Sequence, residues 1–311
     1  MTTRVPAAKN LSGVIASEAK QSPSTLQGPR FLRVAPPYSL QRTLACGQVF
    51  RWRCEGPVAA GIFGGRAVRL MQVADGIQVE GLDHEDQFVR LRHYLGVDEP
   101  LEAIEAELHR DPVMRRVLPH TSGIALLRQD PWECLVSFII SAFNNIPKIE
   151  MSLDRLARSL GERLGESAWA FPGPARLAMA TRAQLRRCLL GYRAPYVKAV
   201  ARLVASGEID LVALGGLPYD EARAKVITLP GVGEKVADCV LLFAYGKTEA
   251  FPVDVWVKRA VERSYFSGRK KTERQIRAFA GDCFGRLAGY AQQHLFYYAR
   301  TAGRERARGS S

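Results

Sequence analysis

Lys235 and the turn that precedes it have residue types that can bind a phosphate and supply a nucleophile for attack on a carbon atom. Leu229–Gly233 reads as a tight turn, and a helix is expected to begin near Glu234, which places Lys235 in its first turn. Gly231 and Gly233 permit positive φ and let a partner approach the backbone closely. Exposed N–H groups and the positive helix end favour a phosphate oxygen. The turn predicts a phosphate anchor, although an ordinary helix–turn–helix corner has the same composition.

Lys235 itself has two interpretations. The helix dipole and partial burial both favour the neutral amine, which is the nucleophilic form. Cys239 lies one turn further along, so the two side chains should point into the same space. The alternative is an exposed helix lysine paired with Asp238, three residues on. The direction of the amine decides between a nucleophile and a surface ion pair.

Asp254 precedes another helical run and has two compatible roles. Aspartate is a good N-cap, and a capping side chain is rigidly aimed. A carboxylate held in this way can also stabilise positive charge at a sugar carbon and help to orient or deprotonate an amine. We therefore expect Lys235 and Asp254 to be the catalytic pair.

Composition narrows the class of protein. The chain has 311 residues, 47% of them hydrophobic, which is enough for one large domain or two ordinary ones. Its 44 basic residues against 31 acidic ones give a formal charge of +13, which suggests a nucleic-acid partner, although a merely basic surface has the same composition. Six cysteines lack CxxC or metal-type spacing, as expected of reduced core residues. With no window that approaches a membrane span and no secretion signal, we expect a soluble intracellular protein.

The predicted fold is α+β, with the sheet first and the helices after it. Alternation predicts antiparallel strands at 48–53, 61–63, 67–73 and 77–79, with turns rich in glycine between them. We expect a disordered extension at 1–35, a sheet domain with helices at 36–118, a mostly helical domain at 119–303 and a flexible basic tail at 304–311.

Helical periodicity covers most of the chain after the strands. Asp130 and Pro131 form a start signal, and the apolar segment 134–143, broken only by two serines, predicts a central buried helix. Helices are expected at 86–95, 100–109, 149–163, 174–180, 182–190, 194–205, 219–228, 234–245, 254–265, 272–283 and 286–301.

The chain resembles the helix-hairpin-helix (HhH-GPD) DNA glycosylases, and most closely their 8-oxoguanine DNA glycosylase/AP lyase branch. The resemblance covers about 37–300. It rests on the hairpin with Lys235 and Asp254, and on five further motifs that occur in the family's order: Gly47–Arg53, Leu127–Pro131, Asn144–Ile146, Gly191–Ala194 and Ala288–Gln292. It implies a TBP-like antiparallel sheet domain followed by a helical HhH-GPD domain.

The resemblance also implies a bifunctional DNA repair enzyme. Such an enzyme rotates the damaged nucleotide out of duplex DNA and reads the base in a pocket. Lys235 would attack the sugar C1′ and form a Schiff base, and β-elimination would then break the strand on the 3′ side. Asp254 would stabilise the developing charge. The excised base would be 8-oxoguanine or a ring-opened purine.

Four residues match the family's base pocket. Gly47 matches the glycine whose carbonyl accepts the N7 hydrogen that 8-oxoguanine has and guanine lacks. Phe296 matches the ring that stacks on the flipped base, Cys239 would close the opposite face, and Gln292 matches the amide that reads the Watson–Crick edge. Gln292 and Phe296 are four residues apart, so one helix face can supply both.

Other positions match DNA contacts, and some depart from the family. Phe143 stands where the wedge is often asparagine, and it fills the gap by stacking or is simply core. Arg193 keeps one of two arginines that read the partner cytosine, but the other position is Lys148, which cannot make the same two-pronged contact. Trp256 replaces a phosphate-contacting histidine. We therefore expect the partner-strand readout to differ. The full set of expected DNA contacts is Phe143, Asn144, Asn145, Lys148, Tyr192, Arg193, Gly231, Val232, Gly233 and Trp256.

The remaining expectations concern cofactors, partners and rival functions. Only Cys283 lies where related branches bind an iron–sulfur cluster, so no cluster and no cofactor is expected. Carbonyls of Ile227, Leu229 and Val232 resemble the family's site for a monovalent or other hard cation. The expected partner is duplex DNA with oxidised guanine, bound by a monomer away from membranes, in the bacterial cytoplasm or nucleoid or in the eukaryotic nucleus. The rivals are an alkylation-type glycosylase without strand cleavage and a non-enzymatic DNA binder.

Overall fold

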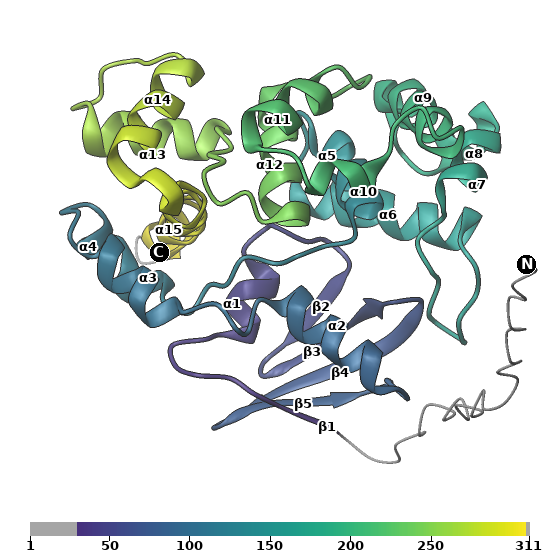
Figure 1. The fold of residues 1–311 in the computed structure, drawn as a ribbon, viewed down its shortest axis with the longest axis horizontal. Helices are drawn as coiled ribbons and strands as arrows, with labels where there is room; N and C mark the ends of the chain where they lie inside the picture. The colour runs from purple at the N-terminus through teal and green to yellow at the C-terminus, as the bar shows by residue number, and fades with distance from the viewer. Residues whose placement is uncertain (1–29, 309–311) are drawn as a thin grey trace, which may run out of the picture.

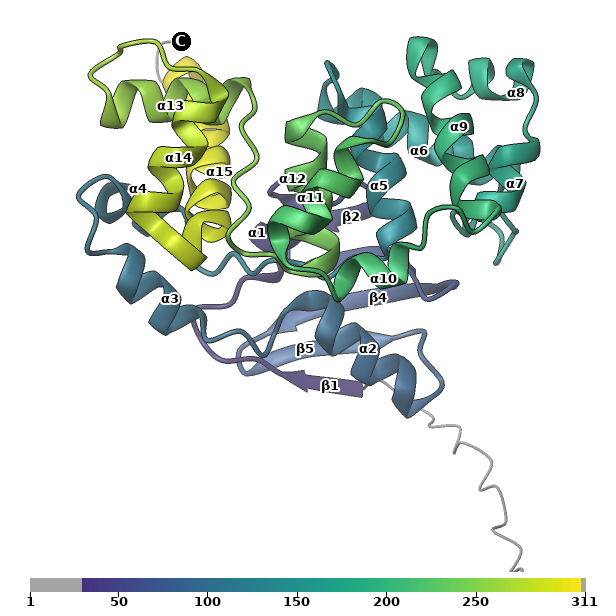
Figure 2. The ribbon, with the colours of Figure 1, turned by 45° about the horizontal axis from the view of Figure 1, so that its top comes forward.

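A twisted sheet and a cluster of helices form the two layers of the protein. The computed structural model describes the backbone of residues 30–308 and side chains through residue 301. Figure 1 shows the sheet along one edge of the molecule, with the helices of the second half of the chain gathered on the other side. Figure 2 shows α2 (Glu85–Leu95) against the sheet, where Trp52 Nε1 donates to Tyr94 Oη of this helix at 2.8 Å. The α+β architecture expected from the sequence is confirmed.

The sheet is five-stranded and antiparallel, with the order β1-β5-β4-β3-β2. The strands β3, β4 and β5 lie where alternation predicts them. β3 pairs with β4 and β4 pairs with β5, and a short turn joins the two strands of each pair. Strand bounds are β1 Arg30–Arg33, β2 Trp52–Glu55, β3 Val58–Phe63, β4 Arg66–Val73 and β5 Gly76–Glu80.

Two expectations about the sheet domain are wrong. β1 lies inside the range expected to be a disordered extension, and it pairs with β5, with Leu32 opposite Ile77. The pairing of β1 depends on a strand that is distant in the sequence. Its four residues therefore carry little local pattern from which a strand could be predicted. Residues 1–29 of that range lie outside the described residues. The strand expected from residue 48 begins only at Trp52, because the Gln48 side chain is buried and bonded to the carbonyls of Thr43 and Ala125.

Helices follow from α2 onward, as predicted, but several were not expected and one begins early. The helices α1, α4 and α10 were missed, and α6 begins at Ile146 because Asn145 caps it. The helix bounds are α1 Leu40–Ala45, α2 Glu85–Leu95, α3 Leu101–Leu108, α4 Met114–Thr121, α5 Pro131–Ser141, α6 Ile146–Leu160, α7 Pro174–Met179, α8 Arg182–Arg187, η1 Gly191–Arg193, α9 Ala194–Ala205, α10 Leu211–Gly215, α11 Tyr219–Ile227, α12 Glu234–Tyr245, α13 Val255–Tyr265, α14 Glu273–Phe284, η2 Gly285–Leu287 and α15 Ala288–Arg308.

Helix α5 is the central buried helix that the apolar run predicts. Asp130 caps its first turn through Glu133 N, with an Oδ1 to N distance of 2.9 Å, and Pro131 is its first residue. Its side chains from Cys134 to Ile140 are buried, and its Phe138 ring stacks on Phe243 of α12 with centroids 5.5 Å apart. The packed α5–α12 pair therefore supports the side chains of the site described below.

The expected boundary between residues 118 and 119 falls inside α4, so that boundary is wrong. Helix α4 packs on α15, where Thr121 Oγ1 lies 2.8 Å from Nδ1 of the buried His294 and the His120 and Tyr298 rings lie 5.4 Å apart. α15 also continues to Arg308, through the first residues of the expected flexible tail, and 309–311 lie outside the described residues. Within residues 30–308, no helix is both long and apolar enough to cross a membrane.

A buried carboxylate fastens α12 to α11 and α14. Asp238 is fully buried and accepts hydrogen bonds from Tyr219 Oη (2.8 Å) and Arg223 Nε (2.7 Å). Arg277 on α14 lies 3.9 Å from its other oxygen, and both arginines also pair with Glu234 at the start of α12. Burial raises the pKa of Asp238, and the two arginines oppose this shift. The network fixes the first turns of α12, which carry Lys235.

We expect Asp238→Ala to lower the free energy of unfolding by about 3 kcal/mol, because it leaves two arginines partly buried without their carboxylate. The measurement is the urea midpoint at an unchanged m-value. Asp282→Ala, at an exposed position on α14, is the matched control and should change stability by less than about 0.5 kcal/mol. Equal effects of the two substitutions would contradict the anchoring role of Asp238.

Candidate active site

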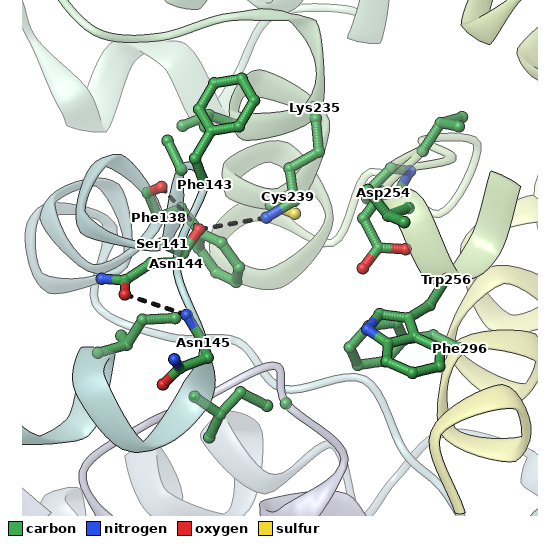
Figure 3. Close-up of a pocket in the computed structure, with 18 of the residues that line it drawn as sticks. Phe138, Ser141, Phe143, Asn144, Asn145, Lys235, Cys239, Asp254, Trp256 and Phe296 are labelled. Carbon is green, nitrogen blue, oxygen red and sulfur yellow. Dashed lines mark hydrogen bonds between the residues drawn. The ribbon is translucent and has the colours of Figure 1, made fainter. Parts of the chain in front are cut away.

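One cavity of about 880 Å³ contains both residues expected to be catalytic. It opens between α5, the start of α12, the start of α13 and α15, and the segment before β2 closes one end with Gly47. Figure 3 shows Lys235 and Asp254 entering the same space from opposite sides. The expected site residues among its lining are Gly47, Phe143, Asn144, Asn145, Gly231, Gly233, Lys235, Cys239, Asp254, Trp256, Gln292 and Phe296.

The Lys235 amine points into this cavity. Its Nζ donates to Ser141 Oγ at 3.2 Å and lies 5.0 Å from the centroid of the Phe138 ring. Ser141 donates its own hydroxyl hydrogen to the Phe138 carbonyl (2.8 Å), so its oxygen is oriented to accept from the lysine. Asp238 faces the arginines on α11 and α14 instead. The alternative of a surface pair between Lys235 and Asp238 is therefore wrong.

Cys239 lies one turn along α12 and shares the space of Lys235, as the spacing predicts. It is buried, and burial raises the pKa of its thiol to about 12 despite the nearby amine. The thiol therefore stays protonated at neutral pH and offers an apolar, polarisable surface rather than a competing thiolate nucleophile.

Asp254 fills both of its expected places. It is the N-cap of α13, accepting from Val257 N at 2.8 Å, and it lines the cavity. Burial raises the pKa of its carboxyl group, while the Val257 N–H and the charge of Lys235 pull it down. The cap fixes the carboxylate toward the cavity (Figure 3), where it can balance positive charge formed near the lysine.

The four base-pocket positions meet in the cavity although they come from three parts of the chain. Gly47 has φ +88°, and a Cβ there would lie 2.9 Å from Phe296 Cε1, so only glycine fits beside the ring. Gln293 Nε2 donates to the Cys46 carbonyl (2.9 Å) and so ties this segment to α15. Gln292 is buried, and its Oε1 has no hydrogen-bond partner among residues 30–301. An unsatisfied buried amide in a cavity is a group prepared for a polar ligand.

The loop between α5 and α6 presents Phe143 to solvent. Its φ is +49° and its side chain is 99% exposed, so the alternative that Phe143 is core is wrong. Arg193 lies beneath this loop, almost fully buried, and donates to the carbonyls of Ala142 (2.8 Å) and Phe143 (2.9 Å). Arg193 therefore supports the loop in this conformation, whereas sequence reasoning assigned it to the partner base.

The neighbouring polar residues also shape this loop. Asn145 Oδ1 caps α6 by accepting from Lys148 N at 3.0 Å, and Asn144 Nδ2 donates to the Ile140 carbonyl at 3.1 Å. Tyr192 is 55% exposed and donates its hydroxyl to the Ala142 carbonyl (3.2 Å). Lys148 is exposed. These residues lie together on the face that carries Phe143, and their expected contacts with DNA stay predictions.

The hairpin between α11 and α12 differs from expectation at one glycine. Gly231 has φ +78° and packs on the Tyr196 side chain, but Gly233, the N-cap of α12, has an ordinary φ of −96°. Nothing lies within 4 Å of a Cβ built at Gly233, so the protein itself does not require glycine there. Trp256, in the first turn of α13, is 46% exposed at the rim of the same cavity.

The hairpin cation site stays a prediction. The Leu229 carbonyl, one of its three expected oxygens, accepts from Val232 N at 3.1 Å. Across the described part of the chain, no group of three or more His, Cys, Asp or Glu side chains is placed to hold a metal ion.

Ser141 and Arg300 are among the lining residues that were not predicted. Ser141 was visible as one of two serines in an otherwise apolar helix. Arg300 lines the cavity, with Cζ 5.1 Å from the centroid of the Phe296 ring. Its signal was the spacing of Gln292, Phe296 and Arg300, each four residues from the next on α15.

Comparison with known proteins agrees with this geometry. A family model described as "8-oxoguanine DNA glycosylase, N-terminal domain" matches 32–135, and one described as "HhH-GPD superfamily base excision DNA repair protein" matches 136–284. A "Probable N-glycosylase/DNA lyase" of Methanothermobacter thermautotrophicus is 36% identical over 62% of this chain and 69% of its own length. The "N-glycosylase/DNA lyase OGG1" of Arabidopsis thaliana is 32% identical over 83% and 76%.

A solved structure supports the same relationship. The 8-oxoguanine glycosylase/lyase of Clostridium acetobutylicum, in complex with double-stranded DNA containing cytosine opposite 8-oxoguanine, superimposes with a TM-score of 0.85 at 33% identity, over 91% of this chain and 99% of that chain. The two family models, the two relatives and this superposition span both the sheet region and the helical region. The chain therefore belongs to the 8-oxoguanine DNA glycosylase family within the HhH-GPD superfamily of base excision DNA repair proteins.

Proposed function

We propose that this protein excises 8-oxoguanine, and ring-opened purines of similar shape, from duplex DNA and then cleaves the strand at the resulting site. The observation that carries this proposal is the direction of Lys235: its amine enters a cavity that is also lined by the helix-capping Asp254, the protonated thiol of Cys239 and the unsatisfied amide of Gln292. A nucleophile, a carboxylate and a base pocket in one cavity are the parts that a bifunctional glycosylase requires.

The reaction begins with an extruded nucleotide whose C1′ faces Lys235. The unprotonated amine attacks C1′, the C1′–N9 bond breaks, and its electron pair leaves with the base. Proton transfer and opening of the sugar ring convert the C1′–N bond into a protonated Schiff base. Loss of the C2′ proton then expels the 3′ phosphate by β-elimination. Asp254 stabilises the positive charge at C1′ as the base departs.

DNA binding uses the face that holds the hairpin and Phe143. The open space at Gly233 and the N-terminus of α12 suit a backbone phosphate. Phe143 is a wedge of the size of a base and can stack in the gap left by the extruded nucleotide. Because Arg193 is engaged with its own loop, we propose that stacking contributes more than hydrogen bonding to contacts with the partner strand.

The proposed substrate also leads to proposals about the oligomeric state, the location in the cell and the need for a cofactor. We infer that the protein acts as a monomer on one kinked duplex, wherever the cell keeps its DNA, in the nucleoid or the nucleus. Lys235 and Asp254 supply the nucleophile and the charge stabilisation, so the proposed chemistry uses no cofactor; a hard cation at the hairpin would only neutralise phosphate charge.

We expect Lys235→Gln to abolish covalent trapping by borohydride on duplex DNA with 8-oxoguanine while DNA binding persists, because the Schiff base needs the amine. Lys235→Arg is the matched control for charge, since a guanidinium keeps the charge but does not form the imine, and it should also fail to trap. Trapping of either variant would contradict the mechanism. Base release by wild-type protein without trapping would indicate the alkylation-type rival, and neither activity would indicate a DNA binder.

We expect Asp254→Asn to slow base excision about 100-fold and to raise the free energy of unfolding at neutral pH. The rate falls because a transition-state charge loses its carboxylate. Stability rises because burial raises the pKa of Asp254 in the folded chain, so ionisation disfavours folding, while asparagine keeps the N-cap. The stability difference should disappear as the pH falls below the unfolded value of about 3.9. Single-turnover rates and urea midpoints measured across pH test both effects; full activity of the variant would contradict the assigned role.

We expect Phe143→Ala to slow excision by about 10-fold without changing stability, since the side chain is almost fully exposed and its value lies in stacking on DNA. The measurement is the single-turnover rate with each of the four bases opposite the lesion. Stacking reads no sequence, so the loss should be similar in all four duplexes. Met179→Ala, at an exposed apolar position on α7, is the control. A loss confined to cytosine would overturn the wedge role.

A further inference from the structure

Helix α15 presents Arg300 to the cavity, and the mechanism above does not use this residue. Gln292, Phe296 and Arg300 follow one another at four-residue spacing, and all three line the cavity. The first two occupy positions of the expected base pocket. Arg300 continues the same row of side chains and brings a guanidinium into the cavity that Lys235 and Asp254 line.

The guanidinium lies at the end of the pocket formed by Gly47. Arg300 Nη1 is 3.0 Å from the place that a Cβ of Gly47 would occupy, and Arg300 Cζ is 5.1 Å from the centroid of the Phe296 ring. The guanidinium charge also acts on neighbouring groups. It lowers the pKa of Asp254 and of Cys46, whereas burial raises the pKa of both groups. Arg300 therefore lies beside Gly47 on the wall of the cavity.

The chemistry of the base explains why a donor belongs beside Gly47. The Gly47 carbonyl is the expected acceptor for N7–H of 8-oxoguanine. In this base N7 is bonded to C5 and C8. C8 carries O8, and C6, which is bonded to C5, carries O6, so a carbonyl oxygen flanks N7–H on each side. A group next to the N7 acceptor therefore meets O8 or O6, and each of these oxygens requires a hydrogen-bond donor. Arginine has five N–H donors and stays charged at every physiological pH.

We propose that Arg300 is a base-contact residue that donates a hydrogen bond to one of the two carbonyl oxygens flanking N7 of the extruded base. This inference rests on the proposed function. Gly47 and Arg300 form an acceptor and a donor side by side, which suits the N7–H and carbonyl pair of an oxidised purine. When the C1′–N9 bond breaks, its electron pair moves into the base and increases the negative charge on these oxygens. The contact therefore strengthens as the base leaves.

An abasic site gives a sharp test, because it contains no base for Arg300 to contact. We expect Arg300→Gln to slow single-turnover release of 8-oxoguanine by about 10- to 100-fold, the loss of one hydrogen bond to a charged group. Strand cleavage at a preformed abasic site, and borohydride trapping on it, should stay within about twofold of wild type. Arg300→Lys should recover part of the base-release rate, since it keeps a charged donor. Arg110→Gln, an exposed arginine paired only with Glu107 among the residues described, is the control.

Each result decides the inference. Unchanged base release by Arg300→Gln would overturn it, and so would an equal loss on 8-oxoguanine and abasic DNA, since that pattern belongs to a residue that supports the fold or the sugar site. The urea midpoints of both Arg300 variants identify a folding defect, and Arg300→Lys carries the test if the Gln variant does not fold. Failure of the proposed function is distinct: wild-type protein would then neither release 8-oxoguanine nor trap on abasic DNA.

Discussion

The site depends on the separation of two charged side chains on the first turns of α12. Asp238 is buried against Arg223 and Arg277, and Lys235 points the other way, toward Ser141. A carboxylate in the interior is stable only with cations beside it, so the arginines on α11 and α14 hold one face of α12 in place. This arrangement leaves the lysine amine in the cavity rather than neutralised by its nearest acid along the chain.

The base pocket joins regions that are far apart in the sequence. The sheet region supplies Gly47, and the buried Gln48 side chain fixes this segment through bonds to the carbonyls of Thr43 and Ala125. Gln293 on α15 donates to the Cys46 carbonyl, so the segment that carries Gly47 is tied to the helix that carries Phe296. The N-terminal half of the chain thus serves chemistry whose nucleophile lies in the C-terminal half.

Residues around the cavity carry local energetic costs. Phe143 combines positive φ with an exposed aromatic ring, Gln292 keeps an unsatisfied buried oxygen, and Asp254 keeps a carboxyl group whose pKa burial raises. Strain and unmet polar groups of this kind persist where a ligand relieves them. All three residues line the same cavity.

By itself, the sequence determined the features that depend on neighbours along the chain. Capping by Asp130 and Asp254, helical periods, strands with glycine turns and the hairpin before Lys235 are encoded within a few residues, and all are present in the structure. Only the tertiary structure decided that Asp238 binds arginines instead of Lys235 and that Arg193 supports its own loop. These choices, like the pairing of β1 with β5, depend on which distant elements pack together, and local periodicity contains no information about that packing.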